Sequence, residues 1–209
     1  AGCEDSRTTN NEGDAMKVAI IKHNAGNVES VGNALRRLGV EPVLTDSHQK
    51  IRAADRVIFP GVGEASSAME YLKANGLDRL IKELRQPVLA ICLGMQVLCA
   101  SSEENETECL GVLPHRVRRI PAKQVKVPHI GWNRISSLNS PLFNGVEEGA
   151  RVYFVHSYFV DVAAETVATC AYGTNFSAAL ASDNFHAVQF HPEKSGQVGA
   201  QILSNFLNL

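Results

Sequence analysis

The chain has 209 residues, of which 44% are hydrophobic and 20% charged, with a formal net charge of −2 and a sequence pI near 6.4. This length and composition are typical of one globular domain, and the near-neutral charge gives no electrostatic reason to expect a nucleic acid or a membrane as partner. The five cysteines are an odd number without a CxxC pair, and no apolar run approaches the length of a membrane-spanning helix. We therefore expect a reduced cytoplasmic protein with no metal site and no cofactor.

Residues 1–15 differ from the rest of the chain. They are polar, rich in Gly, Asn and Thr and without periodicity, and Met16 is followed at once by an apolar run. A signal peptide would need an apolar middle region, which this stretch lacks. We expect a disordered leader or a cloning remnant here, with a native tail as the alternative, and a single domain over 16–209. Cys3 would then have no functional role.

From residue 17 to about 110 the pattern alternates between strand and helix. Apolar runs of strand length occur at 18–21, 43–44, 56–59 and 88–91. Between them, apolar residues recur at helical spacing over 28–38 and 77–84. Continuous apolar runs suit strands buried on both faces, so this rhythm predicts a parallel sheet covered by helices on both sides.

Beyond about residue 110, short strands beside Gly, Pro or Asn predominate. They are expected at 116–120, 151–155, 166–171 and 187–190. We interpret them as an antiparallel extension or mixed edge of the same sheet. A last helix from about Gly196 places Val198, Ile202 and Phe206 on one face. The expected fold is an α/β, flavodoxin-like three-layer sandwich, whose central sheet is mostly parallel with an antiparallel extension.

The strongest chemical motif is a cysteine at the end of a buried strand. Cys92 follows the apolar run 88–91, has the small residues Ala90 and Gly94 two positions away on either side, and precedes a helical pattern. This is the arrangement of a nucleophile elbow. The positive end of the helix favours a thiolate, and the N–H of Leu93 can face an oxyanion. The alternative is a buried structural cysteine.

A second motif, His191-Pro192-Glu193, follows another predicted strand. A histidine supplies the general base that a thiol nucleophile needs, and a nearby carboxylate can orient its imidazole. The fold would have to bring His191 to Cys92 across 99 residues of sequence (191 − 92). On its own, the triplet is more typical of an ordinary turn.

A third motif, Gly61-Val62-Gly63, follows the run 56–59. Two glycines around one residue allow a loop whose amides turn toward a ligand and donate to an oxyanion. A phosphate-binding loop is disfavoured because neither GxGxxG nor GxxxxGK[ST] is present. A simple strand-to-helix turn is the remaining alternative.

Together these motifs resemble those of the class I glutamine amidotransferases. Further segments resemble one branch, the glutaminase subunits of imidazole glycerol phosphate synthases. They lie at 24–27, 128–133, 153–158 and 194–195, and the resemblance runs in order over 16–209. It implies the class I glutamine amidotransferase fold and the hydrolysis of glutamine through a γ-glutamyl thioester on Cys92, with His191 as base and acid and Glu193 as its orienter.

The resemblance also implies roles for other residues. The oxyanion would be held by amides around Gly61, Val62, Gly63 and Leu93. The glutamine would be held by Gln96, Glu104, His156, Ser157 and Tyr158. The ammonia would pass to a (β/α)8-barrel cyclase subunit that makes imidazole glycerol phosphate and an aminoimidazole carboxamide ribotide, so a heterodimer is expected.

Four residues in the branch-specific segments are candidates for the partner-facing surface. They are Trp132, Asn133, Tyr153 and Lys194. Core packing is the alternative for Trp132 and Tyr153, whereas Lys194 is expected to be exposed.

The chain departs from the family pattern at three places: Ala90 stands where Gly is usual, His23-Asn24 where Tyr-Gly is usual, and Glu64-Ala65 where Ala-Phe is common.

Three classes of protein compete with this interpretation. Subunits of anthranilate or aminodeoxychorismate synthesis usually carry His where Met95 stands, and the glutaminase of pyridoxal phosphate synthesis lacks the Gly-Trp-Asn segment. A peptidase or chaperone-like protein of the same fold places a histidine shortly after the cysteine, but residues 93–114 contain none. A non-catalytic scaffold would leave the three motifs unexplained.

Overall fold

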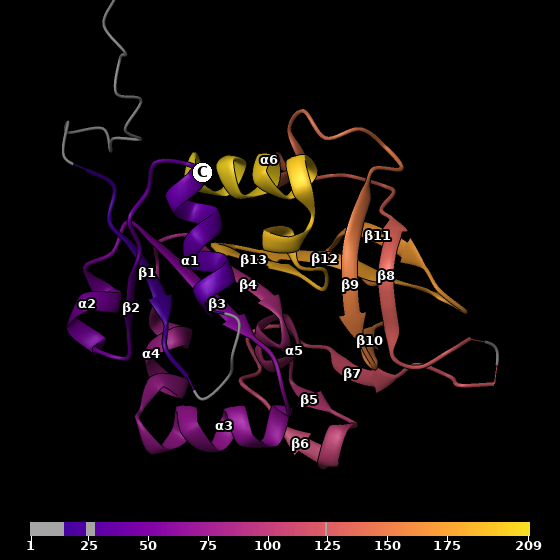
Figure 1. The fold of residues 1–209 in the computed structure, drawn as a ribbon. Helices are drawn as coiled ribbons and strands as arrows, with labels where there is room; N and C mark the ends of the chain where they lie inside the picture. The colour runs from indigo at the N-terminus through magenta and orange to yellow at the C-terminus, as the bar shows by residue number, and fades with distance from the viewer. Residues whose placement is uncertain (1–14, 24–27, 124) are drawn as a thin grey trace, which may run out of the picture.

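A mixed β-sheet runs through the centre of the molecule (Figure 1). The computed structural model describes residues 15–23, 28–123 and 125–209. Within these residues the central sheet has seven strands in the order β11-β12-β13-β4-β3-β1-β2. In chain order they are β1 (Val18–Ile21), β2 (Val43–Thr45), β3 (Arg56–Gly61), β4 (Val88–Cys92), β11 (Thr166–Ala171), β12 (Asn175–Ser182) and β13 (Phe185–Val188). Strands β2, β1, β3, β4 and β13, which are neighbours in this order, are parallel to one another. Strands β12 and β11 then continue the sheet in antiparallel pairing.

Helices cover both faces of this sheet, as the alternating pattern predicted. They are α1 (Val28–Arg37), α2 (His48–Arg52), α3 (Ala65–Ala74), α4 (Leu77–Glu83), α5 (Leu93–Leu98) and α6 (Gly196–Leu207). The first and last lie on one side of the sheet, and α3, α4 and α5 on the other (Figure 1). In β1, Ala19 and Ile21 enter one core and Val18 and Ile20 the other, so a continuous apolar run is what a doubly covered strand needs.

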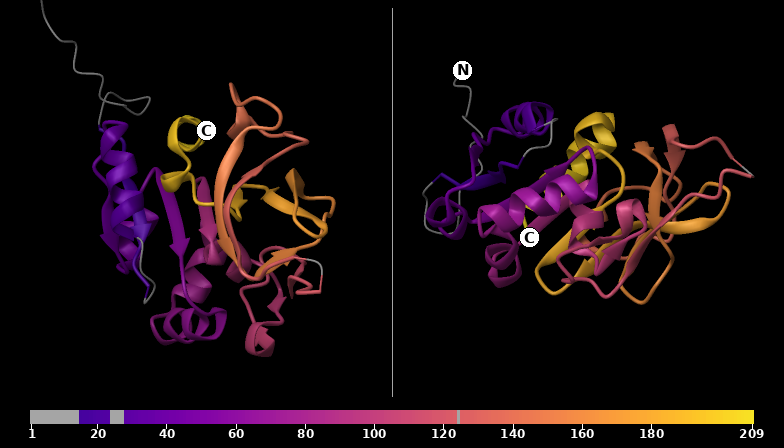
Figure 2. Two further views of the ribbon diagram at one scale, coloured as in Figure 1. Left: turned by 45° about the vertical axis from the view of Figure 1, so that its right-hand side comes forward. Right: turned by 90° about the horizontal axis from the view of Figure 1, so that it is seen from below.

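Two smaller sheets stand beside the central one. One contains β10 (Tyr158–Val160), β7 (Arg116–Arg119), β5 (Ser101–Ser102) and β6 (Thr107–Glu108), in that order. The other is an antiparallel pair, β8 (His129–Arg134) and β9 (Arg151–His156), whose long curved ribbon stands beside the β11 end of the central sheet (Figure 2). Three short 3₁₀ turns complete the described elements: η1 (Glu104–Glu106), η2 (Pro141–Phe143) and η3 (Pro192–Lys194).

The expectation that every late strand extends the central sheet was wrong for two of them. Strands 116–120 and 151–155 correspond to β7 and β9, which belong to the smaller sheets. The strand expected at 187–190 lies earlier, at 185–188, and pairs in parallel with β4. The antiparallel extension itself is present, in β11 and β12.

The topology brings the three chemical motifs to one edge of the sheet. Gly61 ends β3 directly opposite Cys92, which ends β4. On the other side of β4, Val188 pairs with Ile91, so the chain leaving β13 toward His191 emerges at the same edge. The carboxyl ends of parallel strands at a change in connection order are where ligands bind in α/β sheets.

No helix in the described ranges is long and apolar enough to cross a membrane. The predicted leader at 1–15, apart from Ala15, and the 24–27 loop lie outside the described residues.

Candidate active site

Cys92 occupies the sharp strand-to-helix turn that its motif predicted. Its backbone has φ 54° and ψ −107°, a conformation that residues with a side chain rarely adopt, and α5 begins at the next residue. The turn also presses the backbone of α5 onto β3. A Cβ on Gly94 would lie 2.0 Å from the carbonyl oxygen of Phe59, so only glycine fits there.

His191 and Glu193 form a buried pair next to this turn. Nδ1 of His191 lies 2.8 Å from Oε1 of Glu193, and the two residues come from the loop after β13 and from η3. The loop is fixed from two sides. The N–H of His191 donates to the carbonyl oxygen of Tyr153 at 2.9 Å, and the Ser195 hydroxyl donates to the His191 carbonyl at 2.6 Å.

The histidine interacts with the cysteine as well as with the carboxylate. Burial opposes the charged imidazolium, but the nearby Cys92 and Glu193 and their charges outweigh burial and raise the pKa of His191 above its ordinary value. Nε2 of His191 is buried and makes no hydrogen bond of regular geometry within the described residues. Because Nδ1 faces Glu193, Nε2 is the ring nitrogen left to exchange a proton with the sulfur.

A cavity of about 310 Å³ opens beside Cys92. This volume is at the lower end of the roughly 300–1,000 Å³ found for small-molecule sites. The predicted site residues that line it are Val62, Gly63, Cys92, Leu93, Gln96, Glu104, His156, Ser157 and Tyr158. Pro128 and Val155 also line the cavity and were not predicted. Gly61, His191 and Glu193 are not part of the lining.

The glycine loop packs tightly against the elbow. A Cβ on Gly61 would lie 2.9 Å from Cβ of Leu93. A Cβ on Gly63 would meet no described atom within 4 Å, but the φ of 104° at this position favours glycine. His23 binds the carbonyl oxygen of Pro60, immediately before the loop. Burial lowers the pKa of His23, so the ring that holds this carbonyl is neutral.

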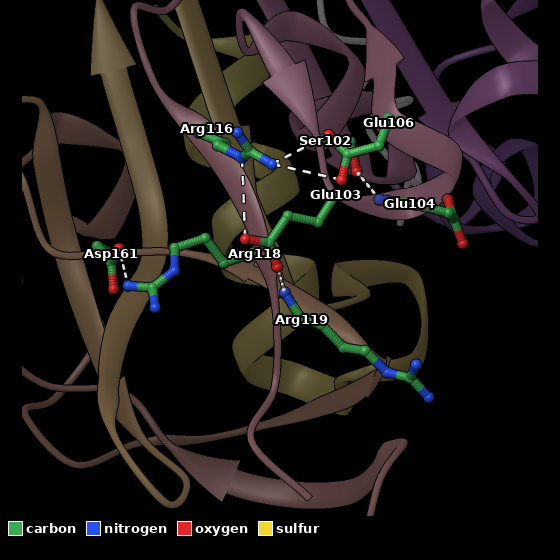
Figure 3. Close-up of polar contacts among 8 residues, drawn as sticks. All are labelled: Ser102, Glu103, Glu104, Glu106, Arg116, Arg118, Arg119 and Asp161. Atoms are coloured by element: carbon green, nitrogen blue, oxygen red, sulfur yellow. Dashed lines mark hydrogen bonds and ion pairs between the residues drawn. The ribbon is translucent and has the colours of Figure 1, made fainter.

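Glu104 differs from the acidic residues around it. Arg116 on β7 forms ion pairs with Glu103 and Glu106. Figure 3 shows the Glu104 carboxylate pointing away from this arginine. One of its oxygens accepts the Ala65 N–H at 2.8 Å, and burial raises the pKa of Glu104. The cavity therefore has one carboxylate that the arginine cluster does not neutralise.

A hydrogen-bonded chain of side chains leads away from the cavity. His156 Nδ1 donates to the carbonyl oxygen of Tyr158 at 2.7 Å, so its Nε2 accepts from Nδ1 of His129 at 2.9 Å. Asn133 Nδ2 lies 3.4 Å from the remaining ring nitrogen of His129. Both rings are neutral in this arrangement, because burial lowers the pKa of His129 to about 4 and that of His156 to about 3.

The candidate partner-facing residues lie on β8, β9 and η3, away from the cavity lining. Trp132 is 48% exposed and stands opposite Tyr153 in the β8–β9 pair, with ring centroids 6.1 Å apart. Core packing is therefore excluded for Trp132, whereas Tyr153 is half-buried. Lys194 is exposed, as expected, and Asn133 is half-buried.

Within the described ranges, no group of three or more His, Cys, Asp or Glu side chains could hold a metal ion. Cys92, Cys99, Cys109 and Cys170 are all free. Burial raises the pKa of Cys99 and Cys109 and sets them apart from a reactive thiol.

Several known proteins and one family model are similar to this chain. A family model described as class-I glutamine amidotransferase matches residues 19–209. Imidazole glycerol phosphate synthase subunit HisH of Bacteroides fragilis (strain YCH46) is 58% identical over 196 residues, which are 93% of this chain and 100% of that protein. The protein of the same name from Bacteroides thetaiotaomicron is 57% identical with the same coverage. A solved structure of a glutamine amidotransferase has a TM-score of 0.71 at 17% identity, covering 91% of this chain and 97% of that chain, which concerns the fold alone.

Proposed function

Because the chain belongs to the class I glutamine amidotransferases, and within them to the HisH glutaminase subunits of imidazole glycerol phosphate synthase in histidine biosynthesis, we propose that Cys92, His191 and Glu193 are its catalytic triad. The observation that carries this proposal is the elbow cysteine at the mouth of a cavity, beside a histidine held by a buried carboxylate. The relatives at 57–58% identity favour this subunit over the sibling amidotransferases and over a peptidase.

The proposed reaction has two steps. The Cys92 thiolate attacks the side-chain carboxamide carbon of glutamine, and His191 gives a proton to the departing nitrogen, which leaves as ammonia. A γ-glutamyl thioester is left on the sulfur. His191 then takes a proton from water, the resulting hydroxide attacks the thioester, and glutamate leaves as the thiolate is restored. Glu193 stabilises the imidazolium that both steps require.

Two groups of residues are assigned to the substrate. The N–H of Leu93 and the amides of the Gly61–Gly63 loop are proposed to hold the oxyanion of each tetrahedral intermediate. The glutamine itself would lie in the cavity, with Gln96, Glu104 and the His156–Tyr158 segment around it. Glu104 is suited to the α-ammonium group because it is the acidic side chain turned away from the arginine cluster.

Membership of the HisH subunits implies partnership with the cyclase subunit of imidazole glycerol phosphate synthase. We propose a heterodimer in which a (β/α)8 barrel covers the face with Trp132, Asn133, Tyr153 and Lys194. Ammonia is protonated in water near neutral pH, so a closed passage across this contact would keep it nucleophilic. Residues 16–209 would form this glutaminase unit, working in the cytoplasm, where thiols stay reduced.

The decisive experiment changes the sulfur alone. Cys92→Ser and Cys92→Ala should abolish glutamate release, measured with the cyclase subunit and its nucleotide ligand present, and should leave the far-UV circular dichroism unchanged. A diazo-oxo-norleucine label should modify Cys92 and spare Cys99, Cys109 and Cys170. Glutamate release by either variant, or labelling at another cysteine, would overturn the assignment.

The partner assignment has its own test. The isolated chain should release glutamate slowly, and addition of the cyclase subunit should accelerate it. Trp132→Ala should weaken the association of the two subunits, measured by calorimetry, whereas Val43→Ala should not, since Val43 is equally exposed but lies on β2, at the opposite edge of the central sheet from β11. Rapid turnover by the isolated chain, or equal binding by both variants, would count against the proposed coupling.

A further inference from the structure

Gln189 is a polar side chain in the interior for which the triad gives no role. It follows β13 directly, its exposed fraction is 0%, and its backbone N–H donates to the Ala178 carbonyl at 2.9 Å. A buried primary amide that lacks partners is costly, so the contacts of this side chain define what it does.

Both ends of the Gln189 amide are engaged. Its Oε1 lies 2.9 Å from Nε2 of Gln96, and its Nε2 lies 3.6 Å from Sγ of Cys92. The side chain therefore bridges a residue of the cavity wall and the sulfur at the elbow.

The direction of this bridge is fixed by a backbone carbonyl. Nε2 of Gln96 lies 3.1 Å from the Tyr158 carbonyl oxygen, which can only accept, so the nitrogen of the Gln96 amide must face it. The second hydrogen on the same nitrogen then points to Gln189, which must present its oxygen. The remaining group of Gln189, its N–H₂, is left to donate to the sulfur.

The Tyr158 carbonyl is itself held in place. His156 Nδ1 donates to the same oxygen at 2.7 Å. A rotation of the Gln96 or Gln189 amide would bring oxygen against oxygen or N–H against N–H at a buried contact, which costs the full desolvation of an unpaired polar group.

We propose that Gln189 is a further functional residue of the glutaminase site, which donates a hydrogen bond to the Cys92 sulfur and ties its position to that of Gln96 in the glutamine cavity. This inference rests on the proposed role of Cys92 as nucleophile. A thiolate accepts such a bond more strongly than a thiol, so the donor favours the deprotonated sulfur. In the thiol form the sulfur can also donate to the Val155 carbonyl oxygen on β9, 3.8 Å away, whereas the thiolate can only accept from Gln189.

A purely structural role predicts something different. If Gln189 served only to satisfy Gln96, its loss would lower thermal stability and leave the chemistry of the sulfur unchanged. The test therefore follows the pH dependence of Cys92 alkylation, which requires neither substrate nor the partner subunit.

The experiment measures iodoacetamide alkylation of the Cys92 peptide by mass spectrometry between pH 5 and 10 in the full chain. Gln189→Met removes the donor at similar volume. Gln189→Glu keeps an oxygen for Gln96 but, when ionised, offers the sulfur an acceptor. The exposed Gln201→Met is the matched control, since within the described residues the Gln201 side chain bonds only to Asn205 on its own helix.

We expect the midpoint of alkylation to move upward by about one pH unit in Gln189→Met, which is a tenfold loss of thiolate at a fixed lower pH. A larger shift is expected in Gln189→Glu and none in Gln201→Met. Unchanged midpoints in folded Gln189 variants would overturn the inference. A wild-type Cys92 that is no more reactive than a model thiol would instead overturn the proposed nucleophile, so the two failures are distinguishable.

A second measurement does not depend on whether the variants fold. In the ¹⁵N-labelled wild type, the side-chain amide resonances of Gln189 should move with the Cys92 midpoint and lose that titration once Cys92 is alkylated. Amide resonances that do not respond to the sulfur would refute the hydrogen bond.

Discussion

Nδ1 of His191 lies 2.8 Å from Oε1 of Glu193, and the two side chains are only 1% and 0% exposed. In water an ion pair of this kind contributes little, but here both partners are shielded from competing solvent. The contact fixes the proton of the neutral ring on Nδ1 and turns Nε2 toward the sulfur. Two residues that are neighbours in sequence thus set the direction in which the proposed base works.

Glu193→Gln should leave the shape of this contact nearly intact while removing its charge. The amide can also present N–H to Nδ1, which favours the wrong tautomer. By analogy with orienting carboxylates in other triads, we expect glutamate release to fall about 10²- to 10⁴-fold. The measurement is single-turnover glutamate release with the cyclase subunit present.

The pH profile separates this effect from a loss of folding. With Glu193 neutralised, the pKa of His191 should fall, because that carboxylate is one of the two groups that raise it. As the pH rises, the remaining activity should therefore begin to fall at a lower pH than in the wild type, because the imidazolium is lost earlier. An unchanged rate and profile in a correctly folded variant would contradict the orienting role.

The close contact at the elbow gives a prediction about stability. A Cβ on Gly94 would meet the Phe59 carbonyl at 2.0 Å, and neither backbone can yield without breaking the register of β3 and β4. Gly94→Ala should lower the free energy of unfolding by about 3 kcal/mol or more, or prevent folding altogether.

Gly32→Ala is the matched control. Gly32 lies inside α1, where a Cβ would come no closer than 3.5 Å to the flexible guanidinium of Arg36. This substitution should be neutral or stabilise the protein by about 0.5–1 kcal/mol. Urea unfolding of both variants measures the contrast, and equal effects would show that the elbow tolerates the side chain.

Gly94 and Gln189 illustrate which features of the site can be predicted from the sequence and which cannot. The apolar run before Cys92 and the small residues around it were sufficient to predict a strand, a sharp turn and a helix, because local sterics determine that geometry. They did not reveal that Gly94 touches Phe59, which lies on a strand 35 residues earlier in the chain. Gln189 stood in a predicted strand, and only the packed structure shows which of its groups meets the sulfur.

The late strands mark a second limit. In β9 the even positions Val152, Phe154 and His156 are buried and the positions between them are not, so alternation predicts a strand with one covered face. The alternation does not show which sheet the strand joins. That depends on pairing with β8, which is separated from β9 by a connection of 16 residues, 135–150. The prediction that Glu104 and His156 hold the substrate rested on the family resemblance, and periodicity alone would not have selected these residues.

Glu104→Gln should separate binding from chemistry. The amide oxygen can still accept the Ala65 N–H, so the start of α3 is preserved, but the negative charge in the cavity is lost. If Glu104 holds the α-ammonium of glutamine, KM should rise roughly 10- to 100-fold while kcat changes only a few-fold. Exposed Glu108→Gln on the neighbouring strand is the control. A drop in kcat at constant KM would place Glu104 in the chemical steps instead.

The neutral His129–His156 pair should make the protein sensitive to acid. Burial holds the pKa of His129 at about 4 and that of His156 at about 3, below the ordinary 6.5 that both regain on unfolding. Their contribution to stability is therefore complete above pH 6.5 and is lost as the pH falls toward 4, because the unfolded state then binds more protons. His23 and His186, whose pKa burial also lowers, act in the same direction, whereas His191 has a raised pKa and does not contribute to this loss.

His129→Gln tests the pair directly. Glutamine carries an N–H₂ that can replace the donor to His156 Nε2, but it does not titrate. The slope of unfolding free energy against pH between 4.5 and 6 should become shallower by about one proton, measured by urea unfolding at several pH values. The same substitution at the exposed His48 is the control for the loss of an imidazole at the surface. If the slope of His129→Gln matches the wild type, His129 must already be protonated in the folded protein, and the chain of neutral rings from Tyr158 to Asn133 would have to be redrawn.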